Sequence, residues 1–558
     1  MASPITDTIR FAVAQLNPTV GDIEGNLRKA RAARAEAAAA GADLLVLSEL
    51  FIAGYPPEDL VLKPAFQDAC RAAVEALAAD TDDGGPGVVV GSPWPENGKV
   101  YNAVVLLDEG RVQGVRYKVE LPNYGVFDEL RVFAVGPLPG PLGFRGLRLG
   151  VPICEDIWFE QVCECLLETG AEMLVVPNGS PYWRGKAEVR QQVALARVVE
   201  TGLPMVYVNQ CGGQDELVFD GGSFGLHADR TLAFQMPQFD EGIVTVTWKK
   251  DAELGWRCTD GQFASLPGLE EANWRACVLG LRDYVNKNGF PGVVLGLSGG
   301  IDSAVVAAMA VDALGASRVH CVMLPYRYTS GDSLRDAAEI AETLLVRYDV
   351  VPIADPVEGF LGALAPVFAG RAPDIAEENI QSRTRGTLLM AISNKFGPMV
   401  LTTGNKSEMS VGYATLYVDM NGGFNPIKDL YKSEVYALAR WRNENRPAGA
   451  LGPKGRVIPE NVITRAPSAE LREDQTDQDS LPPYDVLDDI LECLVEDEMR
   501  IADVVARGHD RETVRKVERL LYIAEYKRRQ AAPGVKITRK NFGRDRRYPI
   551  VNRFRDQG

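Results

Sequence analysis

The chain has 558 residues, of which 46% are hydrophobic and 24% are charged, and this is the composition of an ordinary globular protein. A single hydrophobic core rarely grows beyond about 300 residues, so the length predicts two domains rather than one. The 60 Lys and Arg residues and 76 Asp and Glu residues give a net charge of −16, which repels nucleic-acid backbones. These numbers exclude a disordered or fibrous chain, and nucleic acid is not an expected partner.

The cysteines and histidines indicate a reducing compartment and no structural metal. Nine cysteines without regular spacing do not describe a disulfide framework in so long a chain. The sequence begins without a basic segment followed by an apolar stretch, and no run of about 18 apolar residues occurs. The three histidines form no HExxH motif and no cluster with Cys or carboxylates, so structural zinc is not expected. We expect a cytoplasmic protein without a membrane partner.

The first half of the chain alternates short β runs with helical stretches. The first β run covers residues 9–17, and an Ala-rich helix follows from about 22 to 40, where Gly41 ends it. Further β runs cover residues 43–50, 87–93, 101–108, 111–120, 148–155, 172–180, 204–212 and 242–248. The mixture of hairpins and crossovers predicts packed sheets in an α/β fold.

The second half restarts an α/β pattern after a boundary that we place between residues 250 and 268. A helix, and then strands that alternate with helices, are expected over residues 269–288, 293–300, 302–314, 318–325 and 348–353. This order is typical of a doubly wound parallel sheet, which commonly binds nucleotides. We therefore divide the chain into domains at residues 1–260 and 261–558.

Two later segments differ in composition from the rest of the second half. Residues 446–484 are rich in Pro, Asp, Glu and Gln, which predicts a long loop, and within it we expect 467–483 to act as a lid. The segment from about 535 to 555 is strongly basic although the chain is acidic. Its charges are either a solvated face paired with the acidic stretch 485–498, or local cations for a bound anion.

Three segments of the first half each carry a reactive residue where a strand ends. They are Glu49 in LVLSEL, Lys118 in VRYKVE and Cys154 in LGVPICE. A carboxylate can take the proton of a thiol, and an ammonium group favours the thiolate and then the oxyanion that forms when an amide is attacked. Each residue alone has an ordinary explanation, as a turn cap, a solvated charge or a buried small side chain. Together they predict a site that cleaves an amide.

With these three motifs, residues 8 to 250 resemble the nitrilase (carbon–nitrogen hydrolase) superfamily, whose members carry Glu, Lys and Cys in this order. The resemblance implies a four-layer αββα sandwich. It also implies that Glu49 is a general base, that Lys118 stabilises the transition state, and that Cys154 is the nucleophile that forms a thioester.

The run LPNYGVFDE resembles more narrowly the glutamine-amidase domain of glutamine-dependent NAD synthetases. This resemblance implies that Tyr124, Ser180 and Lys186 hold the amino-acid end of glutamine.

In the second half, LGLSGGIDSAVV combines a strand end, a Gly-containing turn and a helix start. Backbone N–H groups and the helix dipole converge there, so the segment can cradle an anion. It lacks the GK[ST] of a Walker loop, and SGGxDS instead resembles the ATP loop of the pyrophosphatase type, which supports formation of an adenylate. Asp302 in this loop and Glu408 in TTGNKSE offer the hard oxygen ligands that suit Mg²⁺.

From about residue 270 onward the chain resembles NAD synthetases, on the segments PYRYTS, EENIQSRTRGTLLM, TTGNKSE, NPIKDLYKSEVY and PGVKITRKNFGRDRRYPIVNRF. The resemblance implies that Asn379, Glu408 and Lys536 contact deamido-NAD. It implies ATP contacts from Gly296, Leu297, Ser298, Gly299, Gly300, Ile301, Asp302, Ser303 and Thr403. A homo-oligomer, at least a dimer, is also expected on this resemblance.

The expected reaction converts deamido-NAD, ATP and L-glutamine to NAD, AMP, diphosphate and L-glutamate, with Mg²⁺ and with ammonia passed between the sites. Other glutamine-driven adenylating enzymes need an N-terminal Cys, where this chain has Ala2, or a His partner, and His is scarce. A nitrilase-type amidase whose second half only binds a regulatory nucleotide is the alternative. The carboxylate pair Asp302 and Glu408 favours adenylation over that alternative.

Overall fold

Strand β1 (Thr8–Gln15) is largely apolar on both faces because it lies between two layers of the first half of the chain. Phe11 and Val13 enter a core shared with a second sheet, whereas Ala12 and Ala14 enter a core shared with helices. Side chains alternate along a strand, so a continuous apolar run is buried on both faces. The structure, a computed structural model, describes residues 5, 7–417, 422–473 and 475–556.

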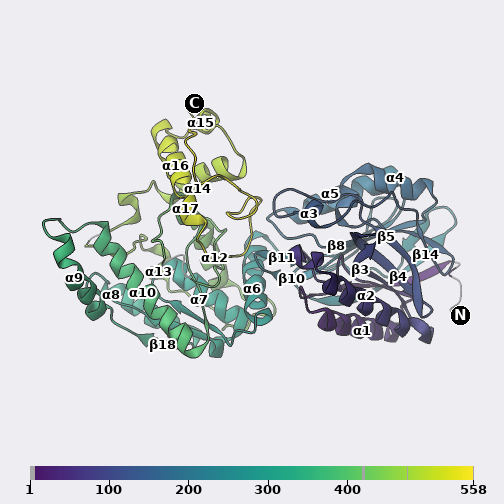
Figure 1. The fold of residues 1–558 in the computed structure, drawn as a ribbon, viewed down its shortest axis with the longest axis horizontal. Helices are drawn as coiled ribbons and strands as arrows, with labels where there is room; N and C mark the ends of the chain where they lie inside the picture. The colour runs from purple at the N-terminus through teal and green to yellow at the C-terminus, as the bar shows by residue number, and fades with distance from the viewer. Residues whose placement is uncertain (1–4, 6, 418–421, 474, 557–558) are drawn as a thin grey trace. The chain divides into compact units, whose positions relative to one another are not determined.

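The first half forms a four-layer αββα sandwich, as expected (Figure 1). Helices α1 (Ile23–Ala39) and α2 (Pro64–Ala79) cover a seven-stranded sheet of order β15-β14-β1-β2-β3-β4-β5. Helices α4 (Glu160–Glu168) and α5 (Lys186–Thr201) cover a six-stranded sheet of order β13-β12-β9-β8-β7-β6.

The remaining elements of this half are its strands and one short helix. The strands are β2 (Leu44–Val46), β3 (Gly87–Glu96), β4 (Lys99–Asp108), β5 (Arg111–Tyr117), β6 (Leu142–Phe144), β7 (Leu147–Gly150), β8 (Met173–Asn178), β9 (Met205–Asn209), β10 (Cys211–Gln214), β11 (Leu217–Asp220), β12 (Phe224–Leu226), β13 (Leu232–Gln235), β14 (Gly242–Asp251) and β15 (Gly255–Cys258), and helix α3 is Glu129–Val132. β4 and β5 form a hairpin in which Glu109 and Gly110 both have positive φ, as a tight two-residue turn requires.

In the second half, four parallel strands form one sheet of order β18-β17-β16-β19. They are β16 (Val293–Gly296), β17 (Val319–Met323), β18 (Arg347–Val350) and β19 (Met399–Val400). The chain moves outward from β16 to β18 and then returns to the other side of β16 as β19. This is the predicted doubly wound α/β arrangement, in which ligands bind at the carboxyl ends of the strands beside such a reversal.

The helices of the second half surround this sheet and continue beyond it. They are α6 (Leu269–Lys287), α7 (Ile301–Leu314), α8 (Gly331–Leu344), α9 (Ala354–Phe368), α10 (Ile375–Phe396), α11 (Lys406–Val411), α12 (Lys432–Glu444), α13 (Glu460–Thr464), α14 (Tyr484–Leu491), α15 (Ile501–Ala506), α16 (Arg511–Ile523) and α17 (Glu525–Arg528). Helices α14 to α16, yellow in Figure 1, share a small core of their own with Val411, Tyr431 and Leu481.

The chain divides between Pro267 and Gly268 into two compact units. Within the described ranges, no helix is both long enough and apolar enough to cross a membrane.

Candidate active sites

Three strand ends bring Glu49, Lys118 and Cys154 together in the first unit. Glu49 follows β2, Lys118 follows β5, and Cys154 opens a short 3₁₀ turn after β7. All three side chains are buried, and Glu49 and Lys118 have no exposed surface. Lys118 Nζ lies 2.7 Å from Glu49 Oε1. The base and the cation proposed from sequence therefore form one ion pair.

A second carboxylate, Glu129, belongs to the same cluster; it ends the run LPNYGVFDE but was not singled out from the sequence. Lys118 Nζ donates to its two oxygens at 2.9 and 3.0 Å, and Asn102 Nδ2 donates to Glu49 Oε1 at 2.7 Å. Burial alone would lower the pKa of Lys118, but the charges of Glu129 and Glu49 raise it well above its usual value. Lys118 therefore remains an ammonium group in this buried site.

The backbone of Cys154 has a φ of +46°, a conformation that is rare for residues with a Cβ atom. Such backbone strain gathers at functional sites, where it aims a side chain. Burial and then the negative charge of Glu49 raise the pKa of the Cys154 thiol well above its usual value. The thiol of Cys154 therefore carries a proton at rest, and the charge of Glu49 acts on it.

The residues expected to hold glutamine lie around this cluster. Tyr124 OH donates to Glu155 Oε1 at 2.8 Å, and its ring is half-exposed. Ser180 is buried in the loop after β8. Lys186 Nζ lies 4.1 Å from the centroid of the Trp158 ring, and burial lowers the pKa of Lys186 to about 8. Trp158 ends the short 3₁₀ turn that Cys154 opens, so Lys186 lies beside the same turn.

A pocket of about 350 Å³ opens at the carboxyl ends of β16 and β19 in the second unit. These strands flank the reversal of the sheet, where a ligand is expected. Of the residues singled out from the sequence, its lining contains Gly296, Leu297, Ser298, Gly300, Ile301, Asp302, Ser303, Thr403 and Glu408.

Side chains of the loop between β16 and α7 fix its conformation through hydrogen bonds within the loop. Gly300 N donates to Ser298 Oγ at 3.2 Å, and Ser303 Oγ donates to Gly300 O at 3.0 Å. Gly299 has a φ of +77°, and a Cβ atom there would lie 2.4 Å from Ser333 O, so only glycine fits. No side chain caps the start of α7, and its first N–H groups can receive a phosphate.

Asp302 and Glu408 approach each other through a third residue, Lys432, which sequence reasoning missed. Lys432 Nζ contacts Asp302 Oδ2 and lies 3.1 Å from Glu408 Oε1. Burial raises the pKa of Glu408 to about 8, and the positive charge of Lys432 opposes this rise. Two carboxylates that face a polyphosphate-sized pocket fit Mg²⁺ by donor chemistry, with Lys432 as the cation already between them.

The other two residues expected at deamido-NAD do not line this pocket. Asn379 lies on α10, one turn before Ser382, which does line the pocket. Lys536 is buried, and its Nζ donates to Thr538 O at 2.9 Å and to a carboxylate oxygen of Asp545. The structure thus places Lys536 in an internal network of the basic tail.

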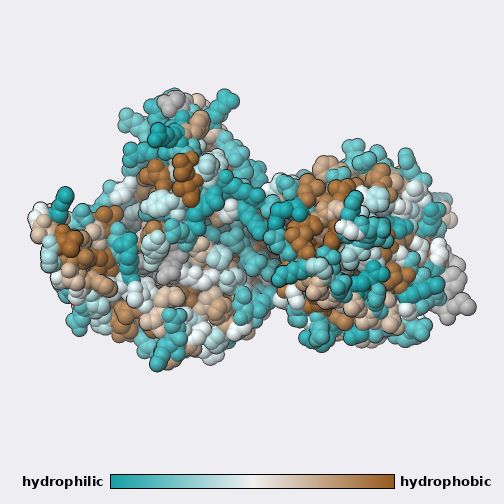
Figure 2. All heavy atoms as spheres, viewed as in Figure 1, coloured by the Kyte–Doolittle hydropathy of each residue, from teal (hydrophilic) through white to brown (hydrophobic). Residues whose placement is uncertain are grey.

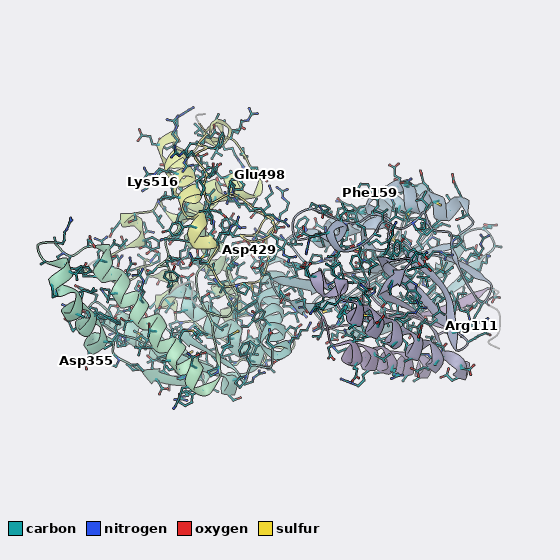
Figure 3. The ribbon with its side chains drawn as sticks, in the orientation of Figure 1. Arg111, Phe159, Asp355, Asp429, Glu498 and Lys516 are labelled. Atoms are coloured by element: carbon teal, nitrogen blue, oxygen red, sulfur yellow. The ribbon has the colours of Figure 1, made fainter. Side chains whose placement is uncertain are left out.

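A buried cation at the start of α11 joins distant parts of the second unit. Lys406 Nζ lies 2.8 Å from Asp429 Oδ1, 2.5 Å from Glu496 Oε1 and 2.5 Å from Thr538 Oγ1. Asp429, labelled in Figure 3, also accepts a hydrogen bond from the backbone N–H of Thr538. Glu408 is two residues after Lys406, so this network supports one wall of the pocket.

Each unit matches one protein-family model. Residues 10–254 match the carbon-nitrogen hydrolase model, and residues 273–531 match the NAD synthase model.

Whole-chain relatives combine the same two parts. The chain is 55% identical to the glutamine-dependent NAD(+) synthetase of Rhodobacter capsulatus over 99% of this chain and 100% of that protein. It is 44% identical to the enzyme of the same name from Thermotoga maritima, over 98% and 99% of the two chains. A solved structure of the glutamine-dependent NAD+ synthetase from Acinetobacter baumannii, in complex with ADP, is 42% identical with a TM-score of 0.77, over 98% of this chain and 99% of that chain.

Proposed function

Because this chain belongs to the family of glutamine-dependent NAD(+) synthetases, we propose that its two units perform two linked half-reactions. The chain is an enzyme, a ligase that forms NAD with glutamine as the nitrogen donor. In our proposal residues 1–260 release ammonia from glutamine, and residues 261–558 join it to deamido-NAD. The observation that carries the proposal is the presence, in one chain, of the Glu49–Lys118–Cys154 cluster and of the ATP-type pocket.

In the first half-reaction, Glu49 takes the thiol proton of Cys154, and the sulfur attacks the side-chain amide carbon of glutamine. Lys118 stabilises the oxyanion, because its ammonium group is fixed beforehand between two carboxylates. Protonated by Glu49, the amide nitrogen leaves as ammonia, and a thioester remains. A water molecule that gives its proton to Glu49 then hydrolyses the thioester to glutamate and the thiol.

Glutamine is held by groups that surround this cluster. The ammonium group of Lys186 pairs with the α-carboxylate of glutamine, while Ser180 and Tyr124 supply hydrogen bonds. Two aromatic rings, Trp158 and Trp183, lie 4.1 and 5.4 Å from Lys186 Nζ and keep the amine in place.

In the second half-reaction, a carboxylate oxygen of the pyridine ring attacks the α-phosphorus of ATP, and diphosphate leaves. Gly296 to Ser303 and Thr403 bind the nucleotide, and the start of α7 receives the diphosphate. Ammonia then displaces AMP from the acyl-adenylate and forms the amide. Asp302 and Glu408 would hold Mg²⁺, which neutralises phosphate charge when it is bound.

The dinucleotide extends from this pocket. Glu408 faces the pocket, and Asn379 lies on the same helix as pocket residues, so both are proposed contacts for deamido-NAD. Lys536 would have to exchange its present bonds to Thr538 and Asp545 to reach a ligand.

We also propose that the enzyme is a homo-oligomer, at least a dimer. Helix α9 carries no charged residue between Gly359 and Phe368, and of its side chains only Val357 is buried. Phe360 and Val367 are 50% and 77% exposed, and Figure 2 shows hydrophobic surface over this helix. The same uncharged stretch of α9 in a second copy of the chain would cover this surface. Light scattering should give at least twice the chain mass, and a monomeric mass would contradict this assignment.

The test of the proposed function separates the two half-reactions. With ATP and deamido-NAD, the enzyme should form NAD and diphosphate from either glutamine or ammonium. Cys154→Ala should abolish formation from glutamine and leave formation from ammonium near wild type, whereas Asp302→Ala should abolish both. Nucleotide binding without any diphosphate would instead support an amidase with a regulatory second unit.

A further inference from the structure

Arg190 is a buried arginine of α5 that lies one turn after Lys186, and nothing in the reaction described above uses it. Only 4% of the residue is exposed. Three of its four hydrogen bonds to described residues go to one loop: Nε donates to Ser180 Oγ at 3.0 Å, and Nη2 donates to Ser180 O at 2.8 Å and to Pro181 O at 3.0 Å. The fourth, from Nη1, goes to Asp220 Oδ2 at 2.9 Å.

The loop that Arg190 holds also holds the general base. Gly179 N donates to Glu49 Oε2 at 2.8 Å, immediately before Ser180 in the chain. A Cβ atom at Gly179 would lie 2.8 Å from the Tyr55 ring and 3.2 Å from Glu49 Oε2, so the loop packs directly against the base. A displacement of Ser180 therefore moves the hydrogen-bond donor of Glu49 as well.

Asp220 fixes the other side of the guanidinium group. It is fully buried at the end of β11, lies 2.7 Å from Arg190 Nη2, and accepts a hydrogen bond from Gln238 Nε2 at 2.6 Å. The guanidinium group is planar, so anchoring one edge to a carboxylate determines where the other donors point. A lysine could keep the ion pair with Asp220, but its single ammonium group could not also hold two oxygens of Ser180 and one of Pro181.

We propose that Arg190 is a positioning residue for the glutamine site, which orients Ser180 toward the substrate and, through Gly179, orients Glu49 toward Cys154. The inference rests on the proposed role of the first unit in glutamine hydrolysis. It assigns Arg190 no contact with the substrate.

The test compares Arg190→Lys, Asp220→Asn and wild type in glutamine hydrolysis, measured as glutamate formed. Arg190→Lys should lower kcat/KM for glutamine by about 100-fold, because a displacement of a catalytic group by about 1 Å can reduce the rate by that factor. Both kcat and KM should change, since Glu49 and Ser180 are both displaced. Asp220→Asn removes the charge but keeps a side-chain oxygen that can accept from Arg190 Nη1, so the guanidinium group stays oriented toward the loop. Glutamine hydrolysis by this variant should stay within about 3-fold of wild type.

Arg145→Lys is the matched control. Arg145 forms a similar buried pair with Asp108, at 2.8 Å, and donates to Gly85 O at 2.7 Å, but none of these partners belongs to the site. It should leave glutamine kinetics unchanged. NAD formation from ammonium should be normal in every variant, and thermal unfolding reports whether the first unit is folded.

Two outcomes would overturn the proposal. Wild-type glutamine kinetics in Arg190→Lys would show that the loop does not need the hydrogen bonds of the guanidinium group. Equal losses of activity in Arg190→Lys and Asp220→Asn would show that only the ion pair matters. If Arg190→Lys unfolds, Asp220→Asn alone still tests the proposal, because a loss of about 100-fold in that folded variant would show that the ion pair, and not the bonds to the loop, controls glutamine hydrolysis. If instead Cys154→Ala still hydrolysed glutamine, the proposed function of the first unit would fail, independently of Arg190.

Discussion

Lys186 ends in a cation whose charge depends on pH within the working range of most enzymes. Its pKa is lowered to about 8 by burial and by the nearby Arg190 guanidinium group. A lysine is charged below its pKa, so the ammonium group of Lys186, which we propose pairs with the carboxylate of glutamine, is lost as the pH rises through 8. Between pH 7 and 9 the charged fraction falls about 10-fold.

We therefore expect kcat/KM for glutamine hydrolysis to fall about 10-fold from pH 7 to pH 9. Lys186→Arg should remove this dependence, because a guanidinium group keeps its charge throughout. Glutamate formation, measured without the second substrates, checks the prediction. A flat wild-type profile over this range would contradict it.

A substitution at Gly299 tests whether the loop between β16 and α7 tolerates one added methyl group. Gly299→Ala adds a methyl group 2.4 Å from Ser333 O in a backbone conformation that costs an L-residue about 1–2 kcal/mol. We expect NAD formation from ammonium to fall at least about 10-fold, since the loop must shift, and glutamine hydrolysis to continue. Gly289→Ala is the control, because Gly289 has a similar φ of +74° and nothing within 4 Å.

Individual site residues differ in how far the sequence could identify them. Glu49, Lys118 and Cys154 each follow a recognisable strand, so strand ends and chemistry were enough to group them. Glu129 and Lys432 were not singled out, because neither residue carries a local signal of its partners. Glu129 meets Lys118 across 11 residues of chain, and Lys432 meets Asp302 across 130. The resemblance to NAD synthetases implied that Lys536 contacts deamido-NAD, and this stays a prediction. In the structure the tail itself supplies hydrogen-bond partners of Lys536.

At the scale of elements, the segment 467–483 is expected to respond to ligands. Apart from Asp474, which lies outside the described residues, only Asp477 and Leu481 of this segment are buried. Ser468 and Leu471 line the ATP-type pocket, so substrates would meet the segment directly.

We expect trypsin to cut the free enzyme at the exposed Arg472, and bound ATP and deamido-NAD to slow this cut. Mass spectrometry of the fragments gives the rate at this bond, and cutting elsewhere in the chain serves as the internal reference. Equal rates with and without ligands would remove the idea of a lid.

Helices and strands could be predicted from the sequence where a local pattern, such as apolar periodicity or a terminating glycine, was strong. The apolar run of β1 and the Ala-rich α1 follow from periodicity and from Gly41, and α6 was expected over 269–288 and covers Leu269–Lys287. Helix α13 (Glu460–Thr464) was not expected within the stretch 446–484. Its Val462 and Ile463 are buried by tertiary contacts, which composition alone does not reveal.

At the scale of the whole molecule, the two half-reactions must share a nitrogen atom. Ammonia in water near neutral pH is mostly ammonium, which has no lone pair to attack an acyl-adenylate. We therefore expect little nitrogen to escape when the enzyme is fed glutamine.

An added ammonia-consuming enzyme should suppress NAD formation from ammonium and leave formation from glutamine nearly unchanged. Glutamine hydrolysis should also quicken when ATP and deamido-NAD are present. Equal suppression with both nitrogen donors would indicate two independent enzymes in one chain.

The buried contact between Lys406 and Thr538 determines when during translation the second unit can complete its fold. Thr538 comes 132 residues after Lys406, so at about 5–20 residues per second the ribosome delivers it on the order of ten seconds later. Until then the wall of α11 beside Glu408 lacks one of its supports, whereas every residue from Glu49 to Asp220 of the glutamine site has already emerged. During each round of translation, the nascent chain therefore contains all the residues that we propose release ammonia before the second unit can complete its fold.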